Sequence, residues 1–186
     1  MRRCIERGSI GPWPVVTALA LAACGPATQS RDGNDRVTQI FAHGFGGPII
    51  DDAGREIGRV TGSPDKEGLI VAFELRGLKP GPHAIHLHEY GRCDPPDFAS
   101  SGGHWNPEGR KHGTDNPFGS HEGDWDNLDI GADGRGDSNR LIPRWHGKIP
   151  ESGLSFIIHA RRDDERTDPD GRSGARSACA IVIPPA

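Results

Sequence analysis

The chain has 186 residues, which is enough for one domain with a modest core. Hydrophobic residues make up 33% of it and aromatic residues 6%, while 27 glycines and 16 prolines are present. That composition favours short strands joined by turns and long loops over a helical bundle. The formal net charge of −4 argues against the basic face that a nucleic-acid-binding protein needs, so we expect no nucleic-acid partner.

The first two dozen residues have the pattern of an export signal. Arg2, Arg3 and Arg7 precede a short apolar run, VVTALALAA, from Val15 to Ala23. A run of nine residues is too short to cross a bilayer, which needs about 20 apolar residues. A basic start, a short apolar run and small residues at its end are typical of a secretory signal.

The signal ends in LAAC, which resembles the signal of a bacterial lipoprotein, in which the cysteine is lipidated and becomes the new N-terminus. We therefore predict an export signal at 1–23, a flexible tether at 24–36 that begins with lipidated Cys24, and the folded domain at 37–186. The alternative is an ordinary signal that is cleaved nearby, with Cys24 incidental. The expected location is the periplasm, with membrane contact only through the lipidated N-terminus.

Removal of the signal changes the charge and the number of cysteines. The signal carries three arginines and one glutamate, so the rest of the chain has a formal net charge of −6. With Cys4 removed and Cys24 lipidated, Cys93 and Cys179 remain, and in an exported protein such a pair is expected to form a disulfide. The alternative is two free buried thiols.

Six segments of the mature chain have the composition of strands. In 68–78 the residues alternate, with Ile70 and Ala72 on one side and Val71, Phe73 and Leu75 on the other. The other five segments are 36–45, 56–63, 83–90, 153–160 and 177–183. From Gly91 to about Asp137 the sequence has little periodicity, and a loop of that length needs something to hold it. We predict an all-β sandwich or barrel with a long loop held by a metal.

Histidines mark the possible metal ligands. His86 and His88 are two residues apart on a predicted strand, so they face the same way, while His83 faces the opposite way. On its own the pair is a weak signal, because solvated or core histidines are more common than metal ligands. His159 ends another apolar strand, where its sequence alone favours a core or edge histidine.

A second group lies in the long loop. His104, His112, His121 and Asp124 fall within twenty-one residues. Three imidazoles and one carboxylate form a plausible tetrahedral set for Zn²⁺, and a bound ion would cross-link a loop that has no core of its own. The alternative is a histidine-rich loop that is merely solvated.

Five segments together resemble the copper/zinc superoxide dismutase family. HAIHLHEYG, GGHWNPEGRKHG, HEGDW, IIHARRDD and GARSACAIV occur in the family's order, and the resemblance covers about Val37 to Ile183. It implies a Greek-key β-barrel or sandwich with long metal-binding and electrostatic loops. It also implies dismutation of superoxide to oxygen and hydrogen peroxide, with one copper and one zinc per subunit.

The resemblance assigns roles to particular residues. The implied copper ligands are His86, His88, His104 and His159, and the implied zinc ligands are His104, His112, His121 and Asp124. His104 would thus be shared by the two metals and would supply a proton. Arg176 matches the arginine beside the copper, Asp163 matches a carboxylate that links one ligand of each metal, and Cys93 and Cys179 match the family's disulfide. His43, His83 and His146 match no family ligand and are expected to be structural or surface residues.

Two segments depart from the animal cytosolic enzymes. The loop 163–176 is shorter, and DPPDFASSGG, between Cys93 and His104, is longer and resembles bacterial exported forms. In the family the second region often contributes to a dimer contact, so a homodimer is possible. Two other functions are compatible with these residues: a non-catalytic copper-binding or copper-delivery domain of the same fold, and a structural lipoprotein with zinc alone.

Overall fold

Strands dominate the part of the chain that the structure describes, residues 44–143 and 150–186 of a computed structural model. The eight strands in these ranges are β1 (Phe45–Asp51), β2 (Glu56–Pro64), β3 (Gly68–Arg76), β4 (Gly81–His88), β5 (Asp124–Ile130), β6 (Arg135–Pro143), β7 (Leu154–His159) and β8 (Arg176–Ile183). One short 3-10 helix, η1 (Ala99–Ser101), lies in the loop that follows β4.

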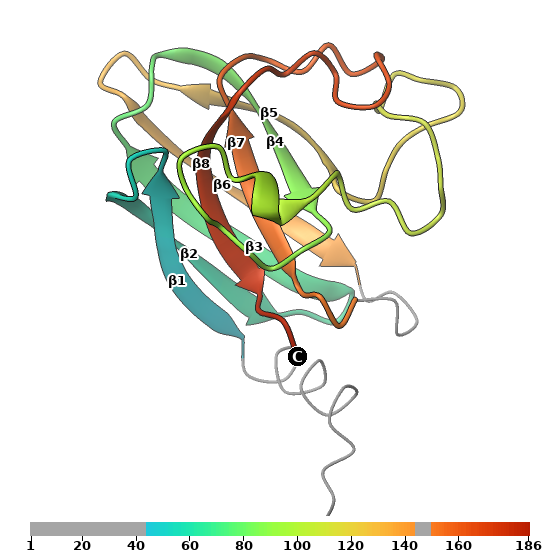
Figure 1. The fold of residues 1–186 in the computed structure, drawn as a ribbon, viewed down its shortest axis with the longest axis horizontal. Coiled ribbons are helices and arrows are strands. Elements are labelled where there is room, and N and C mark those ends of the chain that lie inside the picture. Colours follow the sequence, from blue (N-terminus) through green and yellow to red (C-terminus); the bar gives the residue numbers. More distant parts are fainter. Residues whose placement is uncertain (1–43, 144–149) are drawn as a thin grey trace, which may run out of the picture. The chain divides into compact units, whose positions relative to one another are not determined.

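The strands form one antiparallel sheet in the order β5-β4-β7-β8-β1-β2-β3-β6. Its two edge strands, β5 and β6, are joined by a tight turn at 131–134, so the sheet curls back on itself into a nearly closed barrel (Figure 1). Closing a twisted antiparallel sheet in this way protects the edges that would otherwise be unpaired. The predicted all-β Greek-key class is therefore confirmed.

The barrel interior is filled by alternate residues of the strands. Val71, Phe73 and Leu75 of β3 are buried, while Glu74 between them is exposed, as the alternation in the sequence predicted. Phe73 packs against Phe156 of β7 with ring centroids 5.2 Å apart. Burying each large apolar side chain is worth about 1.5–3 kcal/mol, so this interior supplies most of the stability.

β4 and β7 differ from the other strands because both of their faces are covered. Every residue of β7 is buried, and so are the last six residues of β4. Inward-facing side chains such as Ile85 and Phe156 belong to the main core. On the outer face, Phe98 of the loop after β4 packs with Ile157 and Cys179 in a second, smaller cluster.

Two long loops cover that outer face, one between β4 and β5 and the other between β7 and β8. They lie side by side (Figure 1), and the backbone N–H of Asp115 donates to the carbonyl of Glu165 across 3.1 Å. The disulfide between Cys93 and Cys179, predicted from the sequence, ties the first loop to β8. The sheet and the two loops therefore form a chamber over the outer face of β4 and β7.

Three strands were not predicted from the sequence. β1 was expected to end at Phe45, where in fact it begins, and the predicted segment 36–43 lies outside the described residues. β5 and the start of β6 fall in the region expected to be a loop. Their signal is weak because β5 buries only Trp125, Leu128 and Ile130, and because β6 is polar along its exposed face. The predicted signal and tether at 1–36 also lie outside the described residues.

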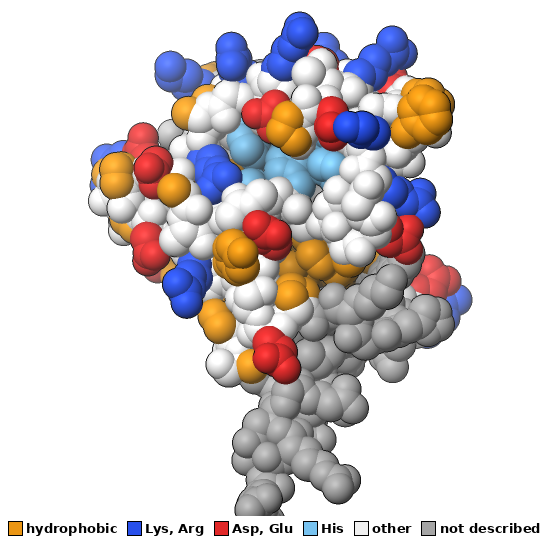
Figure 2. All heavy atoms as spheres, turned by 45° about the vertical axis from the view of Figure 1, so that its right-hand side comes forward, with side chains coloured by type: hydrophobic (Ala, Val, Ile, Leu, Met, Phe, Trp, Pro, Cys, Tyr) orange, Lys and Arg blue, Asp and Glu red, His pale blue; other side chains and the backbone are white. Residues whose placement is uncertain are grey.

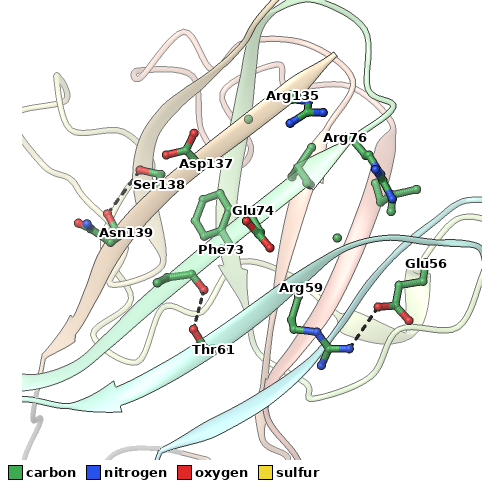
Figure 3. A pocket seen from close by; sticks show the side chains of 15 residues that line it. Glu56, Arg59, Thr61, Phe73, Glu74, Arg76, Arg135, Asp137, Ser138 and Asn139 are labelled. Atoms are coloured by element: carbon green, nitrogen blue, oxygen red, sulfur yellow. Dashed lines mark hydrogen bonds and ion pairs between the residues drawn. The ribbon is translucent and has the colours of Figure 1, made fainter. Parts of the chain in front are cut away.

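The outer face of β2, β3 and β6 carries a shallow polar groove (Figure 3). It is lined by charged side chains, of which Arg59 and Glu56 form an ion pair at 3.4 Å. No histidine or cysteine lines this groove, so it lacks the imidazole ligands that both proposed metal sites need. Within the described ranges, no helix is long and apolar enough to cross a bilayer.

Candidate metal centre

Four histidines converge on one point of the chamber, and each directs one unpartnered ring nitrogen at it. His86 and His88 come from β4, His159 from the end of β7, and His104 from the following loop, where it pairs with His88 through an isolated β-bridge. The unpartnered buried nitrogens are His86 Nδ1, His88 Nε2, His104 Nε2 and His159 Nε2. Ligand atoms of these four residues, called here the histidine quartet, all lie within 4.8 Å of one another.

The outer nitrogen of each ring in the quartet has an oxygen partner. His88 Nδ1 lies 3.0 Å from the carbonyl of Gly102, and His159 Nδ1 lies 3.3 Å from the carbonyl of Gly174. Because a carbonyl oxygen can only accept, both Nδ1 atoms carry the hydrogen and both Nε2 atoms are left with a lone pair. The rings are thus oriented, and their tautomers set, as metal-ligating histidines require.

Three rings of the quartet, those of His88, His104 and His159, are held in the uncharged state that a ligand needs. Burial lowers the pKa of His88 and of His159 well below its usual value, and the neighbouring imidazoles lower it further. Burial also lowers the pKa of His104 to about 4, against the opposing effect of its hydrogen bond with Asp124. At neutral pH these three rings therefore present lone pairs rather than protons.

A second set of ligands surrounds Oδ1 of Asp124, at the start of β5. This oxygen lies 3.1 Å from His104 Nδ1, 3.0 Å from His112 Nδ1 and 3.2 Å from His121 Nδ1. His104 Nδ1 and His121 Nδ1 are 3.4 Å apart. Ligands of a tetrahedral zinc, about 2.0–2.1 Å from the ion, lie about 3.3 Å from one another. The spacing therefore fits a zinc-sized ion, and these four residues (His104, His112, His121 and Asp124) are called here the tetrahedral set.

Within the tetrahedral set, the pKa of the carboxylate and the pKa of a histidine each depend on the hydrogen bond between them. Burial alone would raise the pKa of Asp124, but its hydrogen bonds with the three histidines outweigh that effect and hold the pKa far below its usual value. Burial would lower the pKa of His112, yet its hydrogen bonds with Asp124 and Asp163 raise it to about 9. Without a metal, a proton on His112 therefore partly balances the buried carboxylates.

His104 belongs to both sets through different atoms. Its Nε2 is one of the unpartnered nitrogens of the quartet, whereas its Nδ1 lies beside Asp124. His86 also lies within 4.8 Å of the ligand atoms of His104, His112 and Asp124, but its Nε2 is taken up by Asp163. His104 is thus the imidazole that the two sets share.

Asp163, in the loop after β7, links the two sets through ring nitrogens of His86 and His112. Its carboxylate accepts hydrogen bonds from His86 Nε2 at 2.5 Å and from His112 Nε2 at 3.0 Å. The loop is held in place because the backbone N–H of Asp163 donates to Oδ1 of Asn127 at 2.7 Å. Burial would raise the pKa of Asp163, but the hydrogen bonds from His112 and His86 lower it well below its usual value. One carboxylate therefore orients one ring of each set.

Arg176 stands beside the quartet because of an irregularity in β8. The pairing passes from Ile158–Ala178 to His159–Arg176 and skips Ser177. Arg176 is two residues from the inward-facing Ala178, so regular alternation would turn it toward the core. The extra residue places it opposite His159 instead, and its charge lowers the pKa of both His88 and His159.

The chamber opens to solvent beside these residues. Figure 2 shows histidine side chains at the bottom of a recess whose rim carries basic, acidic and apolar side chains. His86, His88, His112, His121 and His159 are at most 6% exposed, so only a small part of the cluster is accessible.

His83 faces away from the quartet, as the alternation predicted, but it is not a surface residue. It is buried, with Nδ1 2.6 Å from the carbonyl of His159 and Nε2 2.8 Å from the carbonyl of Lys79. It therefore fastens β4 to the end of β7 and has a structural role. His43 and His146 lie outside the described residues.

Some contributing residues were not identified from the sequence. Asp168 accepts from the backbone N–H of His112 at 2.9 Å and from Lys111 Nζ at 2.8 Å, and so joins the two loops. Asn127 anchors Asp163, and Ser101 contacts Arg176. None of these three had a sequence signal, because each lies in a polar segment among many similar residues.

Comparisons with known proteins agree with this geometry. A barrel with two histidine-rich ligand sets under paired loops defines a metal-binding β-barrel protein. A family model described as copper/zinc superoxide dismutase matches residues 57–182, and the chain belongs to that family. The chain is 38% identical over 144 residues to copper–zinc superoxide dismutase 1 of Aquifex aeolicus, which covers 72% of this chain and 84% of that protein.

Other relatives cover more of the chain. The superoxide dismutase-like protein YojM of Bacillus subtilis is 36% identical over 182 residues, 91% of this chain and 93% of that one. A solved structure of a superoxide dismutase-like protein from Bacillus subtilis, in which a tyrosine and a proline are replaced by histidines, has a TM-score of 0.69. It is 38% identical and covers 74% of this chain and 96% of that chain. The copper/zinc enzyme of Brucella abortus has a TM-score of 0.61 at 27% identity, covering 75% and 99%.

Proposed function

We propose that this protein is a superoxide dismutase, with copper in the histidine quartet and zinc in the tetrahedral set. The observation that carries the proposal is His104, whose two ring nitrogens face different ligand sets. If His104 had only a structural role, its buried Nε2 without a hydrogen-bond partner would destabilise the fold by about 1–3 kcal/mol. A metal on each side of the ring would satisfy both atoms.

The two sets fit the two proposed metals. Four imidazole nitrogens without other partners suit copper. Three imidazoles and a carboxylate at tetrahedral spacing suit zinc, which has no redox chemistry and would order the loop that carries His112 and His121. Bound copper would supply reversible one-electron chemistry, which lets one superoxide be oxidised to oxygen and another be reduced to hydrogen peroxide.

Arg176 would attract and orient the substrate. Superoxide is a small anion, whereas the chain carries a net negative charge, so a local positive group must outweigh the rest. The half-buried guanidinium of Arg176 lies close enough to His88 and His159 to lower the pKa of both. Its planar set of donors suits a hydrogen bond to an anion held beside the quartet.

His104 would hold and release the proton that peroxide formation needs. Its Nε2 is directed into the quartet, and its Nδ1 is engaged on the side of Asp124. A proton held at Nε2 therefore lies where the reduced oxygen species leaves. The outer nitrogens of the other three rings are bound to Asp163, Gly102 and Gly174, which are not proposed metal ligands. Only His104 has its outer nitrogen in the proposed zinc set, so only this ring would lie between the two metals.

The second candidate function is a copper-binding or copper-delivery domain without turnover. The observation that favours this second candidate is the similarity to a Bacillus subtilis protein that is named only superoxide dismutase-like. The argument for the enzyme is that all four histidines of the quartet and Arg176 are present together in this chain.

One experiment separates the two. The purified protein is loaded with copper and zinc, its metal content is measured, and superoxide consumption is followed for wild type, His159→Ala and Arg76→Ala. Arg76 is exposed on β3, away from the chamber, and serves as the control. We expect activity in wild type and Arg76→Ala and background rates in His159→Ala. A fully loaded but inactive wild type would favour the copper carrier, and turnover retained in His159→Ala would refute the site.

We also propose that the protein acts in the periplasm, anchored through a lipid on Cys24. The support is the sequence pattern of residues 1–24 and the disulfide between Cys93 and Cys179, a bond that persists in oxidising compartments. Mass analysis of the mature N-terminus is the test, and an unmodified N-terminus downstream of Cys24 would contradict it. We further propose that the protein forms a homodimer, and sedimentation analysis would test this.

A further inference from the structure

Ser101 places a buried hydroxyl between Arg176 and the histidine quartet. It is the last residue of η1 and is completely buried. Its Oγ donates to the carbonyl of Phe98 at 2.9 Å, so its lone pairs remain available to accept. One of them accepts from Nη1 of Arg176 at 3.0 Å.

The same hydroxyl lies against the quartet. Its Oγ is 3.4 Å from Nδ1 of His88, the nitrogen that donates to the carbonyl of Gly102 at 3.0 Å. That carbonyl also accepts from Nη2 of Arg176 at 2.6 Å. Ser101 and Gly102 therefore bring the guanidinium and a ligand ring of the quartet into one hydrogen-bond network.

A guanidinium has five N–H groups, and the network uses three of those on Arg176. Nη1 donates to the carbonyl of Phe98 at 2.6 Å and to Ser101, and Nη2 donates to Gly102. With both hydrogens of Nη1 occupied, the remaining N–H groups are one on Nη2 and one on Nε. Without Ser101, one hydrogen of Nη1 loses its acceptor in a buried place, and the guanidinium can turn to find another.

The position of the hydroxyl is itself fixed by the fold. Phe98, which precedes η1, has a left-handed backbone with φ 53° and is completely buried against Ile157 and Cys179. The disulfide from Cys93 to Cys179 ties the same segment to β8, the strand that carries Arg176. Ser101 is thus a rigid support for Arg176.

We propose that Ser101 is a positioning residue that aims two N–H groups of Arg176 at an anion beside the quartet and so increases the affinity for that anion. The inference rests on the proposed function, because it takes Arg176 as the group that binds superoxide. It concerns a side chain that touches neither the substrate nor a metal.

The test uses azide as a small anionic probe of the copper site. The copper- and zinc-loaded protein is titrated with azide and the charge-transfer absorption is followed. We expect Ser101→Ala to raise the azide dissociation constant about fivefold, because a hydrogen bond from a charged donor is lost. The matched control is Ser100→Ala, in the same turn, whose hydroxyl accepts from the backbone N–H of Asp94 and does not contact Arg176. It should leave the constant unchanged.

A double-mutant cycle distinguishes positioning from a general loosening of the site. If Ser101 acts through Arg176, Ser101→Ala has no further effect on azide binding in an Arg176→Ala background. The copper electron paramagnetic resonance spectrum of Ser101→Ala should match wild type, because Gly102 still orients His88. An equal effect in both backgrounds, an altered copper spectrum, or no difference between Ser101→Ala and Ser100→Ala would overturn the inference.

Failure of the proposed function gives a different result. A loaded wild type that binds azide in an Arg176-dependent manner but consumes no superoxide would refute the dismutase, while the effect of Ser101→Ala on azide would still support the role of Ser101.

Discussion

Nε2 of His86 donates to Oδ2 of Asp163 across 2.5 Å, and both side chains are almost completely buried. The ring comes from β4 and the carboxylate from the loop after β7, 77 residues later in the chain. This hydrogen bond, together with the one from His112 to the same carboxylate, couples the orientation of a quartet ring to that of a ring in the tetrahedral set.

Asp163→Asn should weaken both metal sites. An amide can accept at its oxygen only, so one of the two rings would face an NH₂ group and lose its acceptor. We expect copper and zinc affinity to fall about 10–100-fold, as when the outer partner of a ligating histidine is lost. Competition with a chelator of known affinity measures it.

Asp164→Asn is the matched control for that experiment. Asp164 is the next residue and its carboxylate accepts from Thr167, but it contacts no ligand of either set. Equal metal affinities for the two variants would show that the carboxylate of Asp163 does not support the ligands.

Zinc binding to the metal-free protein should release a proton and strengthen with pH. The pKa of His112 is raised to about 9 from an ordinary value of 6.5, so at pH 7 its ring is protonated without metal. Because zinc needs the neutral ring, affinity should rise about tenfold per pH unit up to about pH 9 and level off above it. Calorimetry in buffers of different ionisation enthalpy measures the released proton, and a pH-independent affinity would contradict the prediction.

The same raised pKa predicts how the stability of the metal-free protein depends on pH. A group whose pKa is higher in the folded state stabilises the fold fully below its unfolded value, here 6.5, and loses that contribution as pH rises through about 9. The free energy of unfolding of the metal-free protein should therefore decline between these values. Denaturant titrations at several pH values measure it, and zinc-loaded protein, in which the His112 ring would be neutral, is the comparison.

Gly171→Ala should disrupt the loop behind the metal sites. Gly171 has φ +62°, and an added Cβ would lie 1.9 Å from Oδ1 of Asp163 and 2.7 Å from Nε2 of His112. The backbone strain and the clash together should cost about 3 kcal/mol or more of unfolding free energy, and zinc affinity should fall.

Gly109→Ala is the control that separates the cost of the backbone conformation from the cost of the steric clash at Gly171. Gly109 has a similar φ of +65° in the loop after β4, but a Cβ there would meet nothing within 4 Å. It should cost only about 1–2 kcal/mol, the price of the left-handed backbone. Equal losses for the two variants in denaturant unfolding would mean that close packing against Asp163 is unimportant.

Reduction of the disulfide should destabilise the metal-free protein. Cys93 and Cys179 are 86 residues apart, and the chain-entropy model gives about 4–5 kcal/mol for closing such a loop. The segment with Phe98 and Ser101 should also exchange its amide hydrogens faster, because the bond ties it to β8. Unfolding and hydrogen exchange with and without reductant measure both effects, and unchanged protection of this segment would contradict the second.

Much of the metal centre could be predicted from local spacing. His86 and His88 share a face because strand residues alternate, and the loop set with His104 and Asp124 stood out by composition. β5 and β6 could not be predicted, because they are half polar and their burial depends on strands far away in the sequence. The same holds for Asn127, whose role depends on Asp163, 36 residues later.

The amino-acid sequence by itself determined the ligand types, their spacing, the family and the all-β class, because these depend on residue identity and on the alternation within single strands. Only the tertiary structure decided that Arg176 faces His159, since the skipped Ser177 in β8 is a property of the pairing between two strands. It also decided that Ser101 supports Arg176. The resemblance already implied that Asp163 links the two sets, and the structure adds its hydrogen bonds from His86 and His112. Hydrogen bonds depend on distance and direction in space, and residues 75 or more positions apart acquire both only when the barrel closes.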